Sequence, residues 1–223
     1  SKEAKQTTTT TANAINFAYE VVNGDTGVVA LEGSDLTLSN SATVRDNATN
    51  DLNVTMPSLT NNVTVDTTAL TMTIVVRDSN SNTIANTALT NKTSFNLLFI
   101  SNKDTTDFAS DDIEVTNGTL SNFARKTDPD PNNQKEYTAT LVSTGGGLTT
   151  TIKVAATKFT DAAGNNNDPA QTEFTSDNSA PTMTITAKDQ NNVNDVDTGD
   201  TTNDNTLKLT FTSTKTTTTF VKS

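Results

Sequence analysis

The sequence predicts an all-β fold in which two-layer antiparallel β-sandwiches follow one another in tandem. First, residues 66–74 and 177–185 carry nearly the same signature, and Asp66 lies 111 residues before Asp177. Second, short segments of alternating apolar and polar residues recur between clusters of Asn, Asp and Gly, which is the pattern of strands and turns. Third, Thr supplies about a fifth and Asn about an eighth of the residues, and these types suit strands and turns respectively.

The internal repeat sets the domain boundaries, because a fixed period marks a tandem array. Residues 95–99 align with 207–211 and Phe108 aligns with Phe220, so later apolar clusters keep the spacing of the signature with a drift of one residue. We therefore predict four segments, namely a flexible Thr-rich arm at 1–12, a partial or divergent β unit at 13–66 that ends a preceding unit, a complete β-sandwich at 67–180, and the opening strands of a following unit at 181–223.

The segment before the complete unit has only short strand signals. Ile15, Phe17 and Tyr19 alternate with smaller or polar residues, and further strand candidates are found at 28–31, 36–38 and 63–65. Because no stretch shows helical periodicity, strands are the expected elements here as well.

Seven strands are expected in the complete unit. They centre on apolar residues at 72–76, 95–100, 113–115, 120–123, 137–141, 152–159 and around Phe174. Asn117-Gly118 marks a turn, and three consecutive Gly at 145–147 make a loop. About seven strands in roughly 110 residues is the size of an immunoglobulin-like sandwich, in which two antiparallel sheets bury their apolar faces against each other.

The apolar positions of these strands form the predicted core. Its members are Met72, Ile74, Phe95, Leu97, Phe99, Ile113, Val115, Leu120, Tyr137, Leu141, Ile152, Val154 and Phe159. Burying one such side chain stabilises a fold by about 1.5–3 kcal/mol, so a core of this size holds the unit together without disulfides.

Composition excludes several classes of function. The net charge of −11 argues against a nucleic acid partner and against adhesion to an anionic membrane. The chain has no Cys and no His, which removes thiol chemistry, Cys-ligated zinc and the usual general base. No apolar run is long enough to cross a bilayer, so membrane insertion is not expected.

Four sequence motifs resemble those of the bacterial Ig-like repeats of very large surface and secreted proteins, including biofilm-associated adhesins. They are residues 112–123, 159–167, 177–181 and 199–204, and the resemblance covers roughly 64–220. The first junction departs from the pattern, with Leu70 where Pro is expected. The resemblance implies an extracellular or cell-surface location and a role as a stalk or fibre element without catalytic activity.

Catalysis is not expected from the residue inventory either. Without His or Cys the common nucleophile–base pairs are missing. A hydrolase using two Asp is the alternative, but paired Asp in such a chain are more often turn residues.

Calcium is the metal that the acidic loops favour, because Ca²⁺ binds about six to eight oxygen ligands from carboxylates, amides and carbonyls. One candidate set is in the last long loop of the complete unit and at the following junction: Asp161, Asn165, Asn167, Asp168 and Asp177. A weaker set follows the second signature: Asp195, Asp197 and Asp200. The alternative is that these side chains cap turns through their own backbone.

Sequons for N-glycosylation occur at five sites: Asn47, Asn53, Asn62, Asn91 and Asn117. Their number is near chance expectation in a chain this rich in Asn and Thr, and Asn117 is also explained by its turn.

The C-terminal segment carries an apolar strand whose own unit is incomplete. The interface residues predicted from it are Leu207, Leu209, Phe211 and Phe220. An unpaired apolar edge pairs readily with another chain, so the partners expected are copies of this chain or neighbouring Ig-like repeats, arranged head to tail. A covalent array and an assembled filament are both consistent with the sequence.

Two functions from different classes remain. One is a structural repeat of an extracellular fibre, filament or adhesin stalk. The alternative is a calcium-dependent module that binds a glycan or another surface, although the chain has no Trp and only two Tyr to offer aromatic faces.

Overall fold

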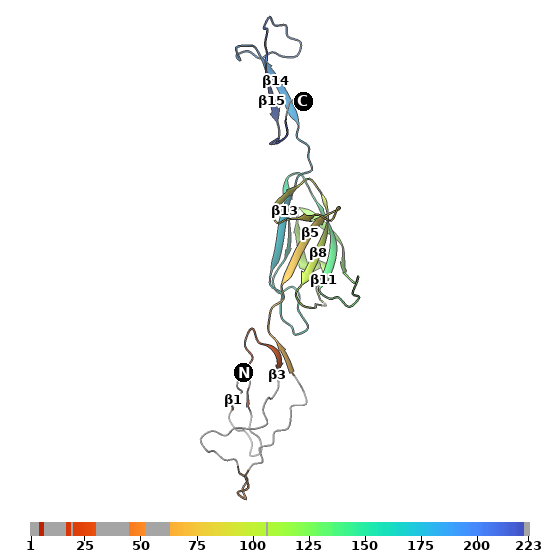
Figure 1. Ribbon diagram of the computed structural model, residues 1–223, viewed down its shortest axis with the longest axis vertical. Coiled ribbons are helices and arrows are strands. Elements are labelled where there is room, and N and C mark those ends of the chain that lie inside the picture. The colour runs from red at the N-terminus through yellow and green to blue at the C-terminus, as the bar shows by residue number, and fades with distance from the viewer. Residues whose placement is uncertain are drawn as a thin grey trace.

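The computed structural model describes residues 5–6, 17–18, 20–29, 45–51, 63–105 and 107–220. Over these residues the chain is elongated, with a central β-sandwich between the antiparallel strand pair β3–β4 on its N-terminal side and a two-stranded ribbon near its C-terminus (Figure 1). The strands outside the sandwich are β1 (Lys5–Gln6), β2 (Phe17–Ala18), β3 (Thr26–Val29), β4 (Val63–Asp66), β14 (Met183–Lys188) and β15 (Lys208–Ser213).

The sandwich consists of two sheets. The five-stranded sheet has the order β10–β11–β8–β5–β6, and the four-stranded sheet has the order β7–β13–β12–β9. Its elements are β5 (Met72–Asp78), β6 (Thr83–Ile84), β7 (Ala88–Thr90), β8 (Ser94–Ser101), η2 (Ser110–Asp112), β9 (Ile113–Thr116), β10 (Gly118–Arg125), β11 (Glu136–Ser143), β12 (Leu148–Val154) and β13 (Ala170–Ser176). All strand pairs are antiparallel except β7 with β13. The predicted all-β, two-layer sandwich is confirmed.

The core lies between the two sheets. Ten of the thirteen predicted core side chains are buried, and Ile74, Val115 and Leu120 are half-buried and pack against them. The prediction omitted five buried residues: Leu70, Val76, Phe108, Ala139 and Phe174. Phe108 lies outside the strands, where its ring contacts four other aromatic rings, so strand periodicity gave no signal for it.

The Asn117-Gly118 turn does not join a hairpin. β9 pairs with β12 in one sheet and β10 pairs with β11 in the other, so the chain changes sheet at Asn117, whose φ is 55°. A Cβ at Gly118 would lie 3.0 Å from the side chain of Leu141 and 3.1 Å from the carbonyl of Val142. The glycine therefore allows β10 to pack closely as the chain crosses over.

The strands outside the sandwich fall in three of the four predicted segments. Within the predicted arm, Lys5–Gln6 pairs with Phe17–Ala18, and the remainder of 1–12 lies outside the described residues. β3 and β4 fall in the predicted preceding unit, and β14 and β15 fall in the predicted following unit.

Candidate functional site at the two junctions

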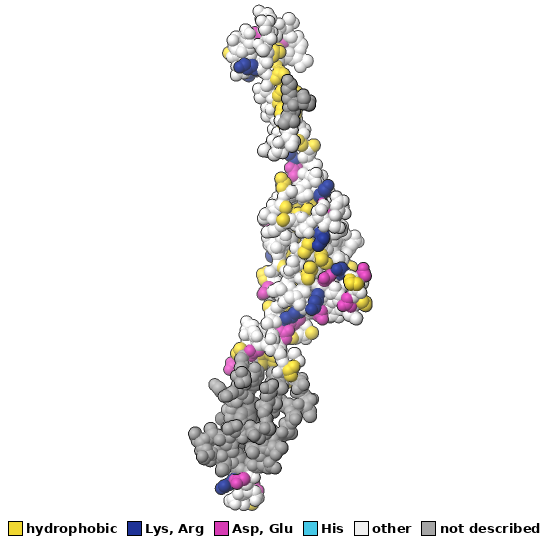
Figure 2. Space-filling model, viewed as in Figure 1, with side chains coloured by type: hydrophobic (Ala, Val, Ile, Leu, Met, Phe, Trp, Pro, Cys, Tyr) yellow, Lys and Arg dark blue, Asp and Glu magenta, His cyan; other side chains and the backbone are white. Residues whose placement is uncertain are grey.

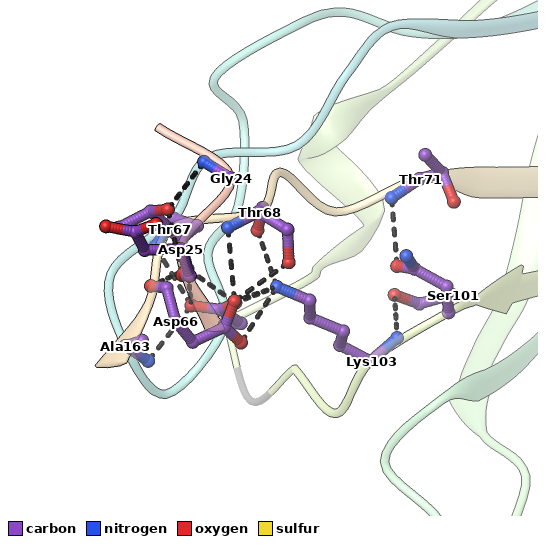
Figure 3. A network of polar contacts seen from close by, with 12 residues as sticks. Gly24, Asp25, Asp66, Thr67, Thr68, Thr71, Ser101, Lys103 and Ala163 are labelled. Atoms are coloured by element: carbon purple, nitrogen blue, oxygen red, sulfur yellow. Dashed lines mark hydrogen bonds and ion pairs between the residues drawn. The ribbon is translucent and has the colours of Figure 1, made fainter. Parts of the chain in front are cut away.

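The N-terminal junction, residues 66–71, is held to the sandwich by Lys103. This lysine follows β8, and its Nζ lies 2.8 and 2.9 Å from the two carboxylate oxygens of Asp66 and 3.0 Å from Oδ2 of Asp161. It also donates a hydrogen bond to the carbonyl of Thr68. Figure 3 shows the side chain of Lys103 reaching from its loop to Asp66 and Thr68. One ammonium thus connects the linker, the β8 loop and the β12–β13 loop.

Further contacts hold the same linker from both sides. Asn165 donates through Nδ2 to the carbonyl of Asp66 at 2.9 Å, and the backbone of Thr71 is hydrogen-bonded to Asn102 on the opposite side. Leu70 is fully buried in the sandwich core. The linker is therefore part of the sandwich and not a free tether.

The charges at this junction stabilise each other. The hydrogen bond from Lys103 lowers the pKa of Asp66 below its ordinary value. Burial raises the pKa of Asp161, but hydrogen bonds from Asn165 and Lys103 outweigh it and hold this pKa at about 2. Burial lowers the pKa of Lys103, and its bonds to Asp66 and Asp161 overcome that effect and raise it. All three groups are consequently charged at neutral pH.

Asp161 is presented by a tight turn with the pattern Asp-x-x-x-Asn. Its Oδ1 accepts hydrogen bonds from the backbone N–H groups of Ala163 and Asn165, and its Oδ2 accepts from the Asn165 side chain. The residue before the Asn, Gly164, has a φ of 85°. The carboxylate orders its own loop and then offers the remaining lone pairs to Lys103.

The same turn occurs at two other places in the described chain. In the turns 46–50 and 78–82 the Asp side chain accepts the same two backbone bonds and the same Asn side-chain bond. The fourth residue again has a positive φ, 68° at Thr49 and 66° at Ser81. The Asn side chain lowers the pKa of Asp46 and of Asp78. The Asp-x-x-x-Asn turn is thus a repeated structural device of this chain.

The C-terminal junction, residues 177–182, repeats the lysine contact. Nζ of Lys215 lies 2.5 and 2.6 Å from the carboxylate oxygens of Asp177 and 2.6 Å from the carbonyl of Ser179. Ser179 hydrogen-bonds to Oδ1 of Asp177, as Thr68 does to Asp66. Lys215 lowers the pKa of Asp177 to about 2. Both junctions therefore place an Asp and a carbonyl of the linker around a lysine, which follows β8 at the first junction and β15 at the second.

The β14–β15 ribbon matches β5–β8 in register. Met183 pairs with Ser213 and Ile185 with Phe211, where the sandwich pairs Met72 with Ser101 and Ile74 with Phe99. The first strand is displaced by 111 positions and the second by 112. The extra residue lies in the turn after the first strand, because the backbone N–H of Asp78 bonds to the carbonyl of Asn82, whereas that of Asp189 bonds to Asn194.

The structure separates the first set of predicted calcium ligands. Asp168 and Asp177 lie on either side of β13, so a whole strand stands between them. Asn167 uses its side chain to bond four backbone groups around Phe159 and Asp168. Asp161 and Asn165 do lie together, but the Lys103 ammonium occupies the place beside them where a cation would bind.

The present arrangement therefore does not fit a calcium ion between Asp161 and Asp66. Among the described residues, no group of three or more acidic side chains is placed to hold a metal. In the weaker set, Asp195 pairs with Lys188 at 2.9 Å, and Asp200 accepts a bond from the backbone of Asp197. Calcium binding by this chain stays a prediction, which a Tm measured with and without millimolar calcium tests.

The remaining predicted sites lie on the surface or outside the described residues. Leu207, Leu209, Phe211 and Phe220 are 40–60% exposed, and Figure 2 shows hydrophobic side chains along the ribbon. The sequons at Asn47, Asn91 and Asn117 are exposed, and the Asn117 side chain bonds to the carbonyl of Thr149. Asn53 and Asn62 lie outside the described residues.

Sequence reasoning missed Lys103 and Lys215. The sequence does contain a signal for them, because they lie 112 residues apart, which is also the separation of the aligned Phe108 and Phe220. In a Thr-rich exposed segment, however, a single Lys looks like a solvated side chain.

Comparison with known proteins assigns one region of the chain to a family. Residues 66–176 match the family model described as a bacterial Ig-like domain. No curated protein and no solved structure matches the chain. In the described part of the chain no helix is long and apolar enough to cross a membrane.

Proposed function

Residues 66–176 of this chain form a bacterial Ig-like domain, and from this premise we propose that the protein is a structural repeat of an extracellular fibre or adhesin stalk. Such domains are typically non-enzymatic and are often found on surface proteins. The proposed role is to hold successive units at a set distance, with neighbouring units joined head to tail.

The observation that carries this proposal is the equivalence of the two junctions. Each has an Asp and a backbone carbonyl of the linker bound by one lysine of the following unit. A linker bound in this way resists bending, because rotation about it separates charged groups that are only partly exposed. Repeating one rigid junction at a fixed period produces an extended structure, as in other repeat proteins.

Solution scattering from the purified chain tests the shape. We expect a rod-like particle whose maximum dimension is insensitive to moderate salt. The double variant Lys103→Met, Lys215→Met should become more flexible, because both junctions lose their ammonium. Lys153→Met is the matched control, since that lysine pairs with Glu114 on the exposed face of the sandwich. A compact particle, or equal flexibility in the control, contradicts the proposal.

The extracellular location needs its own test. Antibodies against the folded sandwich should label intact cells of the source organism, or fibres released from them by shear. Labelling only after the cells are lysed would contradict it.

The glycan-binding alternative has weaker support. Of the large hydrophobic residues that are exposed in the described part of the chain, the aromatic ones are Phe211 and Phe220, whose rings lie 5.4 Å apart. Their counterparts in the sandwich are buried core residues, which favours packing over carbohydrate stacking. A glycan-binding screen with and without calcium distinguishes the two functions.

A further inference from the structure

We propose that two copies of this chain pair through the outer face of the five-stranded sheet, with the strands of the two sheets crossing at a steep angle. The contact surface is a stripe of half-buried aliphatic side chains on that face, namely Val75, Leu98 and Ile100. This inference goes beyond the proposed structural role, because a stalk element needs no contact with a second chain.

The stripe lies on the side of the sheet that faces away from the core. Val76 and Leu97 point into the core, where they are 2% and 1% exposed, so strand alternation turns their neighbours Val75 and Leu98 outward. Val75 is directly opposite Leu98 across β5–β8, and Ile100 is two positions further along β8. Figure 2 shows hydrophobic side chains on this part of the sandwich. Apolar side chains from two strands thus gather at the surface.

The fold itself does not require aliphatic residues at these outward positions. The ribbon β14–β15 has the same pairing register, and its corresponding residues are Thr186, Thr210 and Thr212, all of which are exposed. Thr suits a strand as Val and Ile do, but its hydroxyl is costly to bury without a partner. The sandwich therefore has residues suited to burial where its own repeat has residues suited to water, which favours a contact at this face.

Two opposite charges flank the stripe and favour a second copy of the chain as the occupant. Arg77 lies on β5 two positions beyond Val75. Glu136 lies on β11 two positions before Thr138, which is opposite Leu98. Each charge is a diagonal neighbour of Leu98 at about 7–8 Å. Because β5 and β11 run in the same direction on either side of β8, the two charges lie at opposite corners of the stripe, and such a surface is complementary to itself.

Both charged groups can bind a further partner. Arg77 is exposed, and its Nη1 lies 3.5 Å from the carbonyl oxygen of Ser81, while a guanidinium has five N–H donors. Oε2 of Glu136 accepts a hydrogen bond of 2.6 Å from Lys126. Since a carboxylate offers about four lone-pair positions, Oε1 of Glu136 can accept a charge-assisted hydrogen bond from the guanidinium of a second copy.

One two-fold arrangement satisfies all of these groups. The axis passes over Leu98 in the plane of the contact, perpendicular to the line from Arg77 to Glu136. It places each Arg77 over Glu136 of the other copy, Leu98 against Leu98, and Val75 against Ile100. The strands then cross at a steep angle, near the orthogonal class of sheet packing. The interface is isologous, so it closes as a dimer.

The crossing angle determines what such a contact connects. β5 and β8 run roughly along the long axis of the chain (Figure 1), so the two paired chains cross and do not lie side by side. A contact of this small size is weak by itself, but two fibres that each carry many copies gain from multivalency. This consequence rests on the proposed stalk role, whereas the pairing itself does not.

Charge reversal tests the arrangement in the full 223-residue chain. Arg77→Glu and Glu136→Arg should each raise the concentration needed for half-dimerisation by at least about tenfold in sedimentation equilibrium, because like charges then meet at both corners. An equimolar mixture of the two variants should return it to within about threefold of the wild-type value, since each variant supplies the charge that the other needs. A mixture that associates as weakly as its components overturns the two-fold arrangement.

Replacing the stripe by the residues of the ribbon tests the apolar part of the contact. The triple variant Val75→Thr, Leu98→Thr, Ile100→Thr should also raise the half-dimerisation concentration by at least about tenfold. Leu89→Thr on β7 and Leu209→Thr on the ribbon are the matched controls, because these residues are 75% and 55% exposed, and each should change it by less than about twofold. Loss of pairing in Leu209→Thr would assign the contact to the ribbon and overturn the proposal.

Urea unfolding of the dilute variants verifies that each sandwich is folded, and the exposed charge variants keep the proposal testable if the triple variant is not. A wild-type chain that stays monomeric up to about 1 mM overturns the proposal. In that case a rod-shaped monomer in solution scattering still supports the proposed function, so the two failures are distinguishable.

Discussion

The strand pair β5–β8 and the ribbon β14–β15 share the same pairing register but lie in different environments. Phe99 is fully buried and Phe211 is 45% exposed, although each faces an Ile of the partner strand. The linker shows the same contrast, because Leu70 is buried whereas its counterpart Pro181 is exposed. Local sequence thus suffices to pair two strands, but burial requires an opposing sheet. The sandwich has one, whereas among the described residues no sheet covers the ribbon.

The largest effect is expected from truncating the two aligned Phe residues. Phe99→Ala should lower the free energy of unfolding of the sandwich by about 3–5 kcal/mol, because it empties a packed core site. Phe211→Ala should lower it by less than about 0.5 kcal/mol, since that ring does not contribute to the sandwich core. Urea unfolding of dilute chains measures both, and similar losses would mean that the ribbon and the sandwich unfold as one unit.

Replacing the junction lysines should show the same contrast as truncating the two Phe residues: Lys103→Met should reduce sandwich stability more than Lys215→Met. Lys103→Met leaves Asp66 and the buried Asp161 without their cation, so a loss of about 1–3 kcal/mol in sandwich stability is expected. Lys215→Met should leave sandwich stability nearly unchanged, because its partners belong to the linker after β13. Thermal unfolding of the two variants beside Lys153→Met provides the comparison, and an unchanged Lys103→Met would show that this junction does not contribute to stability.

Acid should weaken the sandwich through Asp161. Hydrogen bonds hold the folded-state pKa of Asp161 at about 2, below its ordinary 3.8. Its contribution to stability is therefore complete above about pH 4 and is lost as the pH falls toward 2. Urea midpoints between pH 2 and pH 6 should show this loss, and it should be smaller in Asp161→Asn. An identical acid profile in that variant would assign the loss to other carboxylates.

The smallest effect is expected at the repeated turns. Asn165→Ala removes the turn bond to Asp161 and the bond to the Asp66 carbonyl, so a loss of about 1–2 kcal/mol is expected. Asn82→Ala removes only the corresponding turn bond to Asp78, for which about 0.5–1 kcal/mol is expected. A larger loss for Asn82→Ala in thermal unfolding would mean that the linker contact contributes little.

Prediction from sequence succeeded where the relevant residues are close along the chain. The alternation around Phe95 and Leu97 identified β8 and its buried face, and the spacing of the Phe residues located the ribbon. Periodicity gave no signal for Phe108, which lies in a loop, or for Leu70, which is buried because the linker is hydrogen-bonded between two loops. The sequence grouped Asp161 with Asp177 as calcium ligands, but the structure places them apart because β13 lies between the two residues.

By itself, the sequence determined the period, the strand positions and the alignment of the two signatures, since these depend on residue patterns of short range. Only the tertiary structure decided that an ammonium lies beside Asp161. Lys103 and Asp161 are 58 residues apart, and their meeting depends on how the two sheets bring the β8 loop and the β12–β13 loop to one end of the sandwich. The strength of that contact comes from its low exposure, a property that packing creates and that no stretch of residues carries alone.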